Sequence, residues 1–343
     1  TSPRFANANG ASAAAVALAI AAHEYTWSST ECLTGVMNTK ISTLAGMPLA
    51  DLLFVIAMAR VLKTVRQALD EAKMTTRVVP PGKRQDAFYD LVEATFIDAS
   101  AYPVIAHAIC IISKIKATAE IIQRIFAQHF LTVNFKPGKT EALISFYGKG
   151  SQALQRDLFA NAVSTVTLSD GTLLRLVRNY KHLGTREGVD GTSNGEAHHR
   201  VGSGASVVKQ LKPVLKNHRI PVSKRVTLVY THISTHTLHN SGTWTELSQG
   251  ANNKVHNLHM WAFRLIAGED HQSVVQGCKQ RISDHAILDR LNAPAPELMI
   301  ALNRLLLFVR VIVKAPTFYF SLLTVPMHEK CSWLHSVLRR QLV

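Results

Sequence analysis

The residue with the clearest potential for chemistry is Asp98, a single carboxylate set between two short apolar runs at 91–97 and 100–106. Runs of this length on either side of a polar residue predict two strands joined by a tight turn. No other carboxylate occurs between Glu93 and Glu120. An acid at the tip of a hairpin can face a metal ion or a catalytic partner, but a single Asp at a turn can equally form an Asx-turn. The segment alone leaves both interpretations open.

The positive charge of the chain is the second feature that bears on function. The net charge is +15 and the pI is about 9.8. Residues 1–185 carry 19 basic and 13 acidic side chains, a balance of +6, and residues 186–343 carry 19 and 10, a balance of +9. A surplus spread over the whole length fits a protein that lies along a polyanion. A basic protein without a nucleic-acid partner remains the alternative.

Cysteine spacing and apolar segments bear on the cellular compartment. The chain has four widely spaced cysteines without a Cys-x-x-Cys pair: Cys32, Cys110, Cys278 and Cys331. We therefore expect reduced thiols in an intracellular protein. We separately expect the compartment to be the nucleus. No secretory signal is evident. The apolar stretch 298–325 is interrupted by Arg304, Arg310 and Lys314, which predicts a buried helix pair and no membrane partner.

The pattern of apolar residues predicts the elements that must position Asp98. A helix over 49–72 follows the turn around Gly46, because Pro48 suits the first turn of a helix. The hairpin comes next, and a long amphipathic helix over 108–130 follows it. The remaining elements of this half are a strand at 141–147, a helix at 151–162 and a strand pair at 163–183. This order indicates an α+β fold with an antiparallel core.

Glycine content suggests where the first half of the chain ends. Residues 184–206 are rich in Gly, Ser, Thr and Asn, which predicts a linker over 186–206. The region 207–343 that follows is predicted to be mostly helical. Within it, residues 225–238 are rich in Val, Thr and Ile. That composition locally favours a strand, although we expect a helix there.

Four segments, in chain order, resemble the later palm motifs of reverse transcriptases from non-LTR retrotransposons. They are residues 43–54 (TLAGMPLADLLF), 94–101 (ATFIDASA), 131–142 (LTVNFKPGKTEA) and 179–184 (NYKHLG). The corresponding family patterns are a Gly-rich turn before a helix, an aromatic-x-Asp-Asp hairpin, a Lys-Thr-Glu turn before a strand and an aromatic-x-x-Leu-Gly hairpin. The resemblance implies an incomplete polymerase palm in 1–185 and a helical, thumb-like region in 207–343.

The same resemblance implies a role for individual residues in RNA-templated DNA synthesis. Asp98 would bind Mg²⁺ in a two-metal mechanism, and Lys139 would lie near the triphosphate and protonate the departing pyrophosphate. The residues implied to contact substrate are Gly46, Pro48, Phe96, Tyr180 and Gly184. The implied partners are an RNA template, a DNA primer or an RNA–DNA duplex. Apart from the resemblance, Lys139 also fits a solvated lysine at the start of a strand.

We expect this chain to be a truncated, degenerate member of that class without activity. The second aspartate of the hairpin pattern is replaced by Ala99, and the only acids ahead of Gly46 are Glu24 and Glu31. We therefore expect the chain to begin after the family's other metal-binding aspartate. One carboxylate makes a poor magnesium site, because the ion is reluctant to lose its water. The alternatives are a non-catalytic basic nucleic-acid-binding protein and a pseudogene product.

Histidine is abundant, with 16 residues. On a helix, His232, His236 and His239 would share one face at positions i, i+4 and i+7, a spacing that could bind zinc. Surface or packed histidines are the more common outcome of such spacing, and we expect that outcome here.

Overall fold

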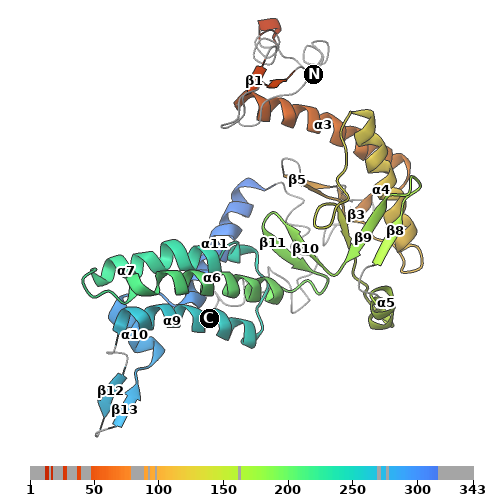
Figure 1. Cartoon of the computed structure of the whole chain (residues 1–343). Helices are drawn as coiled ribbons and strands as arrows, with labels where there is room; N and C mark the ends of the chain where they lie inside the picture. Colours follow the sequence, from red (N-terminus) through yellow and green to blue (C-terminus); the bar gives the residue numbers. More distant parts are fainter. Residues whose placement is uncertain are drawn as a thin grey trace. The chain divides into compact units, whose positions relative to one another are not determined.

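The computed structural model describes residues 12–14, 17, 26–28, 37–39, 48–78, 89–91, 93–96, 99–160, 164–268, 272–275 and 278–315 (Figure 1). They fall into two compact units. The first comprises residues 1–76, 91–134 and 168–171, and the second comprises 77–90, 135–167 and 172–343. Helices and small sheets occur in both, so the α+β class is confirmed at that level.

Two long helices form the core of the first unit. Helix α3 (Pro48–Glu71) begins at a proline, whose missing N–H costs nothing in the first turn. Its residues Val61, Val65 and Leu69 lie one turn apart and pack with Ile125 of α4 (Ile111–Gln128). The predictions of helices at 49–72 and 108–130 are therefore confirmed, with the second shorter at both ends.

A short hairpin lies between these helices in the sequence. Strand β5 (Ala94–Phe96) pairs antiparallel with β6 (Ala99–Ala101), and the Thr95 and Ser100 hydroxyls are 3.0 Å apart. Just ahead of β5, the carboxylate of Glu93 accepts a hydrogen bond of 2.6 Å from Arg66 Nε on α3. This contact raises the pKa of Arg66. The Glu93 side chain is 1% exposed, so the ion pair connects the hairpin to α3.

The second unit contains a three-stranded sheet of order β7-β9-β8. Strand β9 (Leu173–Val177) pairs antiparallel with β8 (Ser164–Thr167) and parallel with β7 (Glu141–Leu143). Gly171, with φ +86°, lies in the connection between β8 and β9, where glycine relieves backbone strain. The strand pair predicted for 163–183 is confirmed, while the strand at 141–147 and the helix at 151–162 are shorter, as β7 and α5 (Ser151–Leu158).

The other strands pair two by two. They are β1 (Thr26–Ser28) with β2 (Met37–Thr39), β3 (Thr76–Val78) with β4 (Tyr89–Leu91), β10 (Asn179–His182) with β11 (Thr185–Gly188), and β12 (Gln272–Val275) with β13 (Cys278–Arg281).

The helical part of the second unit packs around α9 (Gln249–Ala267). The elements beside it are α6 (Asn194–Leu215), α7 (Val222–Leu228), the π-helix η1 (Val229–Ser234), α8 (Thr235–Thr237), the 3-10 helix η2 (Ser241–Thr243), α10 (Asp284–Leu291) and α11 (Pro296–Lys314). Buried side chains from α6, η1, α9 and α10 form one hydrophobic cluster that includes Val208, Ile233, Phe263 and Ile287. The prediction of a mostly helical second half is confirmed for the described residues.

Residues 186–206, predicted to be a linker, form β11 and the first half of α6 instead. The prediction was wrong because α6 already begins at Asn194, and one glycine of this stretch, Gly204, serves helix packing. A Cβ atom on Gly204 would lie 2.3 Å from Thr237 Oγ1 and 2.8 Å from Leu258 Cδ2. Only a residue without a side chain lets α6 come this close to α8 and α9.

The Val- and Thr-rich stretch 225–238 is helical, as expected, and one part of it is a π-helix. Burial of Val226, Val229 and Ile233 outweighs the strand propensity of their side chains. The exposed hydroxyl of Thr231 donates to the carbonyl of Thr227, four residues earlier (3.0 Å). Such bonds are compatible with the helix.

Two histidines of α9 take part in structural contacts. His259 is fully buried, and burial lowers its pKa, so the ring is neutral. Its Nδ1 donates to the Val255 carbonyl (2.9 Å), and its Nε2 accepts from the Ser234 hydroxyl (3.2 Å). His256 bridges Asp284 of α10 (3.0 Å) and Glu297 of α11 (2.9 Å). Both are therefore occupied in holding helices together.

The segment 298–325 begins as the single helix α11, and residues after 315 lie outside the described ranges. Its first half is buried on one side, through Pro296, Ile300 and Arg304. Within the described part of the chain, no helix combines the length and the apolar character that a membrane crossing requires.

The close packing at Gly204 leads to a stability prediction. Gly204→Ala should lower the free energy of unfolding of the second unit by about 1–3 kcal/mol, the usual cost of overpacking. Gly202→Ala, on the same helix with nothing within 4 Å of the new Cβ, should raise it by up to about 1 kcal/mol. Urea denaturation followed by circular dichroism measures both changes. Equal effects of the two substitutions would contradict the packing argument.

Candidate nucleic-acid interface

The residues predicted for metal binding are only partly within the described ranges. Asp98 and Gly46 lie outside them. The strands on both sides of Asp98 pair antiparallel with Phe96 opposite Ala99, so the predicted hairpin pairing is confirmed. Pro48 is the first residue of α3. The relation of Asp98 to the other candidate residues stays a prediction.

The described residues do not provide a magnesium site. No group of three or more His, Cys, Asp or Glu side chains in these ranges is arranged to hold a metal ion. Ala99 has no ligand atom on its side chain. Mg²⁺ needs several hard oxygen ligands with negative charge, and the described part of the hairpin contributes only hydroxyls. The described residues alone therefore do not fit the ion.

Two other candidates, Lys139 and Tyr180, are brought together in the second unit. The Tyr180 hydroxyl donates a hydrogen bond to the Lys139 carbonyl. Partial burial, together with the charges of Glu141 and Glu187, raises the pKa of Tyr180, so it keeps its proton. The Lys139 side chain is exposed. Its ammonium can therefore meet an anion while the backbone of its turn is held in place.

The turn that carries Lys139 is fixed by a carboxylate. The backbone N–H of Gly138 donates to Glu141 Oε1 (2.9 Å), and Arg175 on β9 forms an ion pair with the same oxygen (3.0 Å). Gly138 has φ +76°, a left-handed conformation that glycine adopts without strain. The sequence Pro-Gly-Lys-Thr-Glu thus folds locally into a turn that presents Lys139.

Gly184 lies at the tip of the β10–β11 hairpin. Leu183 and Gly184 both have positive φ angles, 47° and 83°, as a type I′ turn requires. The registered pairs Tyr180–Glu187 and His182–Thr185 flank this turn. The predicted hairpin at 179–184 is confirmed, and its proposed contact with a primer strand stays a prediction.

A buried ion pair attaches this hairpin to α6. Glu196, 2% exposed, accepts from the backbone N–H of Arg186 (2.8 Å) and from Arg200 Nε (2.5 Å). The Arg200 guanidinium also donates to the Gly184 carbonyl. Burial lowers the pKa of His199, and the positive charge of Arg186 lowers it further. The tip of the hairpin is therefore fixed in a positively charged setting next to the first turns of α6.

A row of exposed cations continues along α6, and the sequence analysis did not single it out. Lys209, Lys212 and Lys216 are all exposed and lie within about 60° of one another around the helix axis. Arg219 and Lys224, also exposed, follow in the connection to α7 and in α7 itself. These five residues are called the lysine strip below.

No acid occurs near the lysine strip in the sequence, because the chain has neither Asp nor Glu between Glu196 and Glu246. Among the described residues, no salt bridge involves a strip side chain. The nearby Arg225 is different: it is 3% exposed and donates to the carbonyls of Leu215, Ile220 and Ile266. The strip residues therefore face solvent, whereas the guanidinium of Arg225 is buried and hydrogen-bonded. The sequence signal that could have identified the lysine strip was the absence of acids between Glu196 and Glu246, together with the helical spacing of Lys209, Lys212 and Lys216.

The histidines considered for zinc binding lie beside this region. His232 is in η1, His236 is in α8, and His239 follows α8; all three are exposed. His236 Nδ1 lies 3.4 Å from the Ser203 hydroxyl. Because the π-helix changes the helical repeat at 229–234, the i, i+4, i+7 argument does not carry over unchanged.

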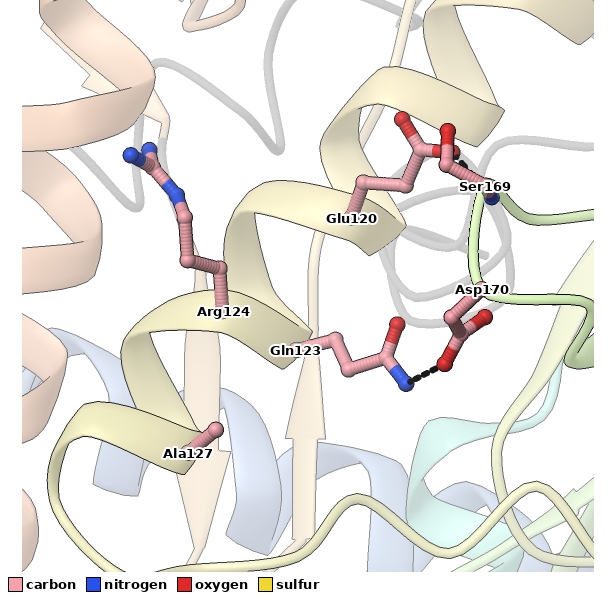
Figure 2. Close-up of a pocket in the computed structure, with 6 residues that line it drawn as sticks. All are labelled: Glu120, Gln123, Arg124, Ala127, Ser169 and Asp170. Carbon is pink, nitrogen blue, oxygen red and sulfur yellow. Dashed lines mark hydrogen bonds between the residues drawn. The ribbon is translucent and has the colours of Figure 1, made fainter.

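A shallow pocket in the first unit, between α4 and the turn at 168–171, has polar side chains that are already paired (Figure 2). Ser169 donates through its N–H (2.8 Å) and its hydroxyl (2.7 Å) to Glu120 Oε1. Gln123 donates to Asp170 (2.8 Å), and Arg124 points away from both pairs. These contacts hold the turn on α4, which is a structural role.

Comparisons with protein-family models, with curated proteins and with solved structures found no match.

The attachment of the hairpin to α6 can be tested at Glu196. Glu196→Ala leaves the Arg186 N–H and the Arg200 guanidinium without their buried acceptor. We expect a loss of about 2–4 kcal/mol in the free energy of unfolding, measured by urea denaturation, and faster hydrogen exchange at the Arg186 amide. Glu187→Ala, an exposed acid on the same strand, should change stability by less than about 0.5 kcal/mol. A Glu196→Ala variant as stable as Glu187→Ala would disprove the attachment.

Proposed function

We propose that this chain is a fragment of a retrotransposon reverse transcriptase that holds nucleic acid and does not polymerise by itself. RNA-templated DNA synthesis is the activity of the class. The partners are an RNA template, a DNA primer or an RNA–DNA duplex, and the site of action is the nucleus. The proposal has two parts, binding and class, and each rests on different support.

The lysine strip is the observation that carries the binding part. Lys209, Lys212 and Lys216 repel one another, and like charges one turn apart destabilise a helix by a few tenths of a kcal/mol per pair. A polyanion removes this cost and releases counterions on binding. The exposed Lys139 and the fixed tip at Gly184 add positive charge and hydrogen-bond donors in the same unit.

The order of elements supports the class. A helix begins at Pro48, the paired strands β5 and β6 come before and after Asp98 in the sequence, and a second long helix follows. A turn with Lys139, strand β7 and the hairpin at Gly184 come next, and the described residues from 194 to 315 are mostly helical. This is the order that the resembling palm motifs imply, while the turn around Gly46 and Asp98 itself lie outside the described residues.

The sequence lacks two of the carboxylates that polymerisation would need. Ala99 stands where the hairpin pattern has its second aspartate, and the acids ahead of Gly46 do not match the family's strand aspartate. The two-metal mechanism needs carboxylates from more than one strand, and Asp98 would be the single acid of its hairpin. A non-catalytic nucleic-acid-binding protein is the second candidate, because the lysine strip requires no catalysis. The pseudogene product is the third, and it predicts neither binding nor activity.

The binding part predicts a salt-dependent affinity. The chain should bind a 20-base-pair RNA–DNA hybrid or DNA duplex, with log K falling against log salt with a slope of about −4 to −5 for five contacts. Changing Lys209, Lys212 and Lys216 together to Gln should reduce the slope by about 2 to 3, since each phosphate contact contributes about 0.9. Fluorescence anisotropy over a range of salt concentrations measures both.

The matched control removes the same charge elsewhere. Lys63, Lys149 and Lys254 are also exposed, and changing them together to Gln leaves the same net charge. This variant should keep most of the parent slope. If both triple variants lose equally, the effect comes from net charge, and the strip is not the interface. A chain that fails to bind at low salt refutes the binding part.

The class part predicts an absence of polymerisation. On an RNA template with Mg²⁺ or Mn²⁺, the chain should not extend a DNA primer, and Ala99→Asp alone should not restore extension, because one hairpin cannot supply all metal ligands. Ala99→Asp combined with an upstream segment bearing the family's strand aspartate should be the minimum repair, and Asp98→Asn should abolish it. Extension by the unmodified chain that is lost on Asp98→Asn would show that the site is intact. If the repaired chain binds but never extends, the non-catalytic alternative is favoured.

A further inference from the structure

Three helices of the second unit meet at the imidazole ring of His256. The ring extends from α9, and its two nitrogens face carboxylates on two other helices. Nδ1 lies 2.9 Å from Glu297 Oε1 in the first turn of α11, and Nε2 lies 3.0 Å from Asp284 Oδ2 in the first turn of α10. One side chain therefore bridges α10 and α11 to α9.

The two contacts determine how many protons the ring carries. An ionised carboxylate only accepts hydrogen bonds, whereas a neutral imidazole has one N–H and one bare nitrogen. With a single proton, the bare nitrogen would turn its lone pair toward a carboxylate oxygen 3.0 Å away or less, which is repulsive. Both contacts are hydrogen bonds only when both nitrogens carry protons, as in the imidazolium ion.

The charged groups around His256 favour this state. Arg264, also on α9, donates to the other carboxylate oxygen of Asp284. Burial raises the pKa of Asp284, but the hydrogen bonds from Arg264 and His256 outweigh it and hold that pKa below its usual range. The neutral His259, three residues further along α9, adds no charge. Asp284 and Glu297 thus face two cations, His256 and Arg264.

The two carboxylates differ in their other partners. Asp284 accepts from Arg264 as well as from His256, whereas in the described part of the chain Glu297 accepts a hydrogen bond from His256 alone. A single remaining proton on the ring is therefore favoured on Nδ1, where Glu297 has no second donor. Nε2 is then the nitrogen that becomes bare, and Asp284 keeps Arg264.

We propose that His256 is a proton-dependent junction of α9, α10 and α11. With both nitrogens protonated it binds the two acids, and when Nε2 gives its proton to water the bridge is reduced to the Glu297 contact. Water can reach the ring, because the side chain is 26% exposed. The junction does not depend on the proposed function, since it uses neither the lysine strip nor the palm-like residues.

The junction weakens on both sides of an optimum pH. The His256 contribution to stability is present where the ring holds both protons and is lost as the pH rises; an ordinary imidazole has a pKa of about 6.5. The Asp284 contribution is present above the pKa of an unfolded Asp, about 4, and is lost as the pH falls below it, because folding lowers the pKa of Asp284. The junction is therefore strongest at about pH 5–6.

The first experiment compares the full chain with His256→Gln by urea denaturation at pH 5.5 and pH 8. The unfolding equilibrium constant of the parent should rise about three- to tenfold more than that of the variant over this range, as expected for one charge-assisted hydrogen bond at a partly exposed site. His285→Gln is the matched control. His285 pairs with Asp289 within α10 (2.8 Å) and is 86% exposed, so this variant should follow the parent to within about twofold. A His256→Gln variant with the parent's pH profile would overturn the proposal.

Nitrogen NMR of the unsubstituted chain, labelled with ¹⁵N-histidine, tests the proton count directly and needs no variant to fold. After assignment of the His256 ring, both nitrogens should have the chemical shifts of protonated nitrogens at pH 5.5. At pH 8 Nδ1 should remain protonated and Nε2 should be bare. A bare nitrogen at pH 5.5 would overturn the two-carboxylate bridge, and two protons retained at pH 8 would overturn its pH dependence.

Discussion

The close approach of α6 to α8 and α9 at Gly204 is the constraint on which the second unit depends. With Thr237 Oγ1 only 2.3 Å from the position of an added Cβ, the separation of the helices is set by the absence of a side chain. This packing buries Val208 and Leu215 completely, and it leaves the other side of α6 to solvent. The exposed lysines and the buried apolar residues thus lie on different sides of α6, and Gly204 allows the close packing of the buried side.

The first turns of α6 extend that constraint to the β10–β11 hairpin. Glu196 accepts from Arg186 and Arg200, and Arg200 reaches the Gly184 carbonyl. A buried carboxylate is stable here because it has two donors, one of them charged. The hairpin tip and the lysine strip are consequently connected by the same rigid helix. A ligand that contacts both meets a preorganised surface, and little conformational entropy is lost in binding it.

Periodicity predicted the long elements well, and composition misled where glycine served packing. Helices α3 and α4 and the β8–β9 pair follow from local pattern, since their apolar faces repeat with the period of the element. Residues 186–206 were predicted to be a linker from their composition. A lone sequence does not show that Leu258, more than 50 residues away, fills the space beside Gly204. For the site, the motifs correctly indicated the turns at Lys139 and Gly184. The lysine strip was missed because its main signal is an absence of acids, which a search for motifs does not register.

The exposed lysines of α6 and the ion pair at Glu196 respond to salt in different ways. Salt screens interactions between exposed charges, with a Debye length of about 10 Å at 0.1 M, and it screens buried pairs much less. Glu196 is 2% exposed, whereas Lys209, Lys212 and Lys216 face solvent. Added salt therefore weakens the attraction that the lysine strip can offer to a polyanion, and it leaves the hairpin tip attached to α6.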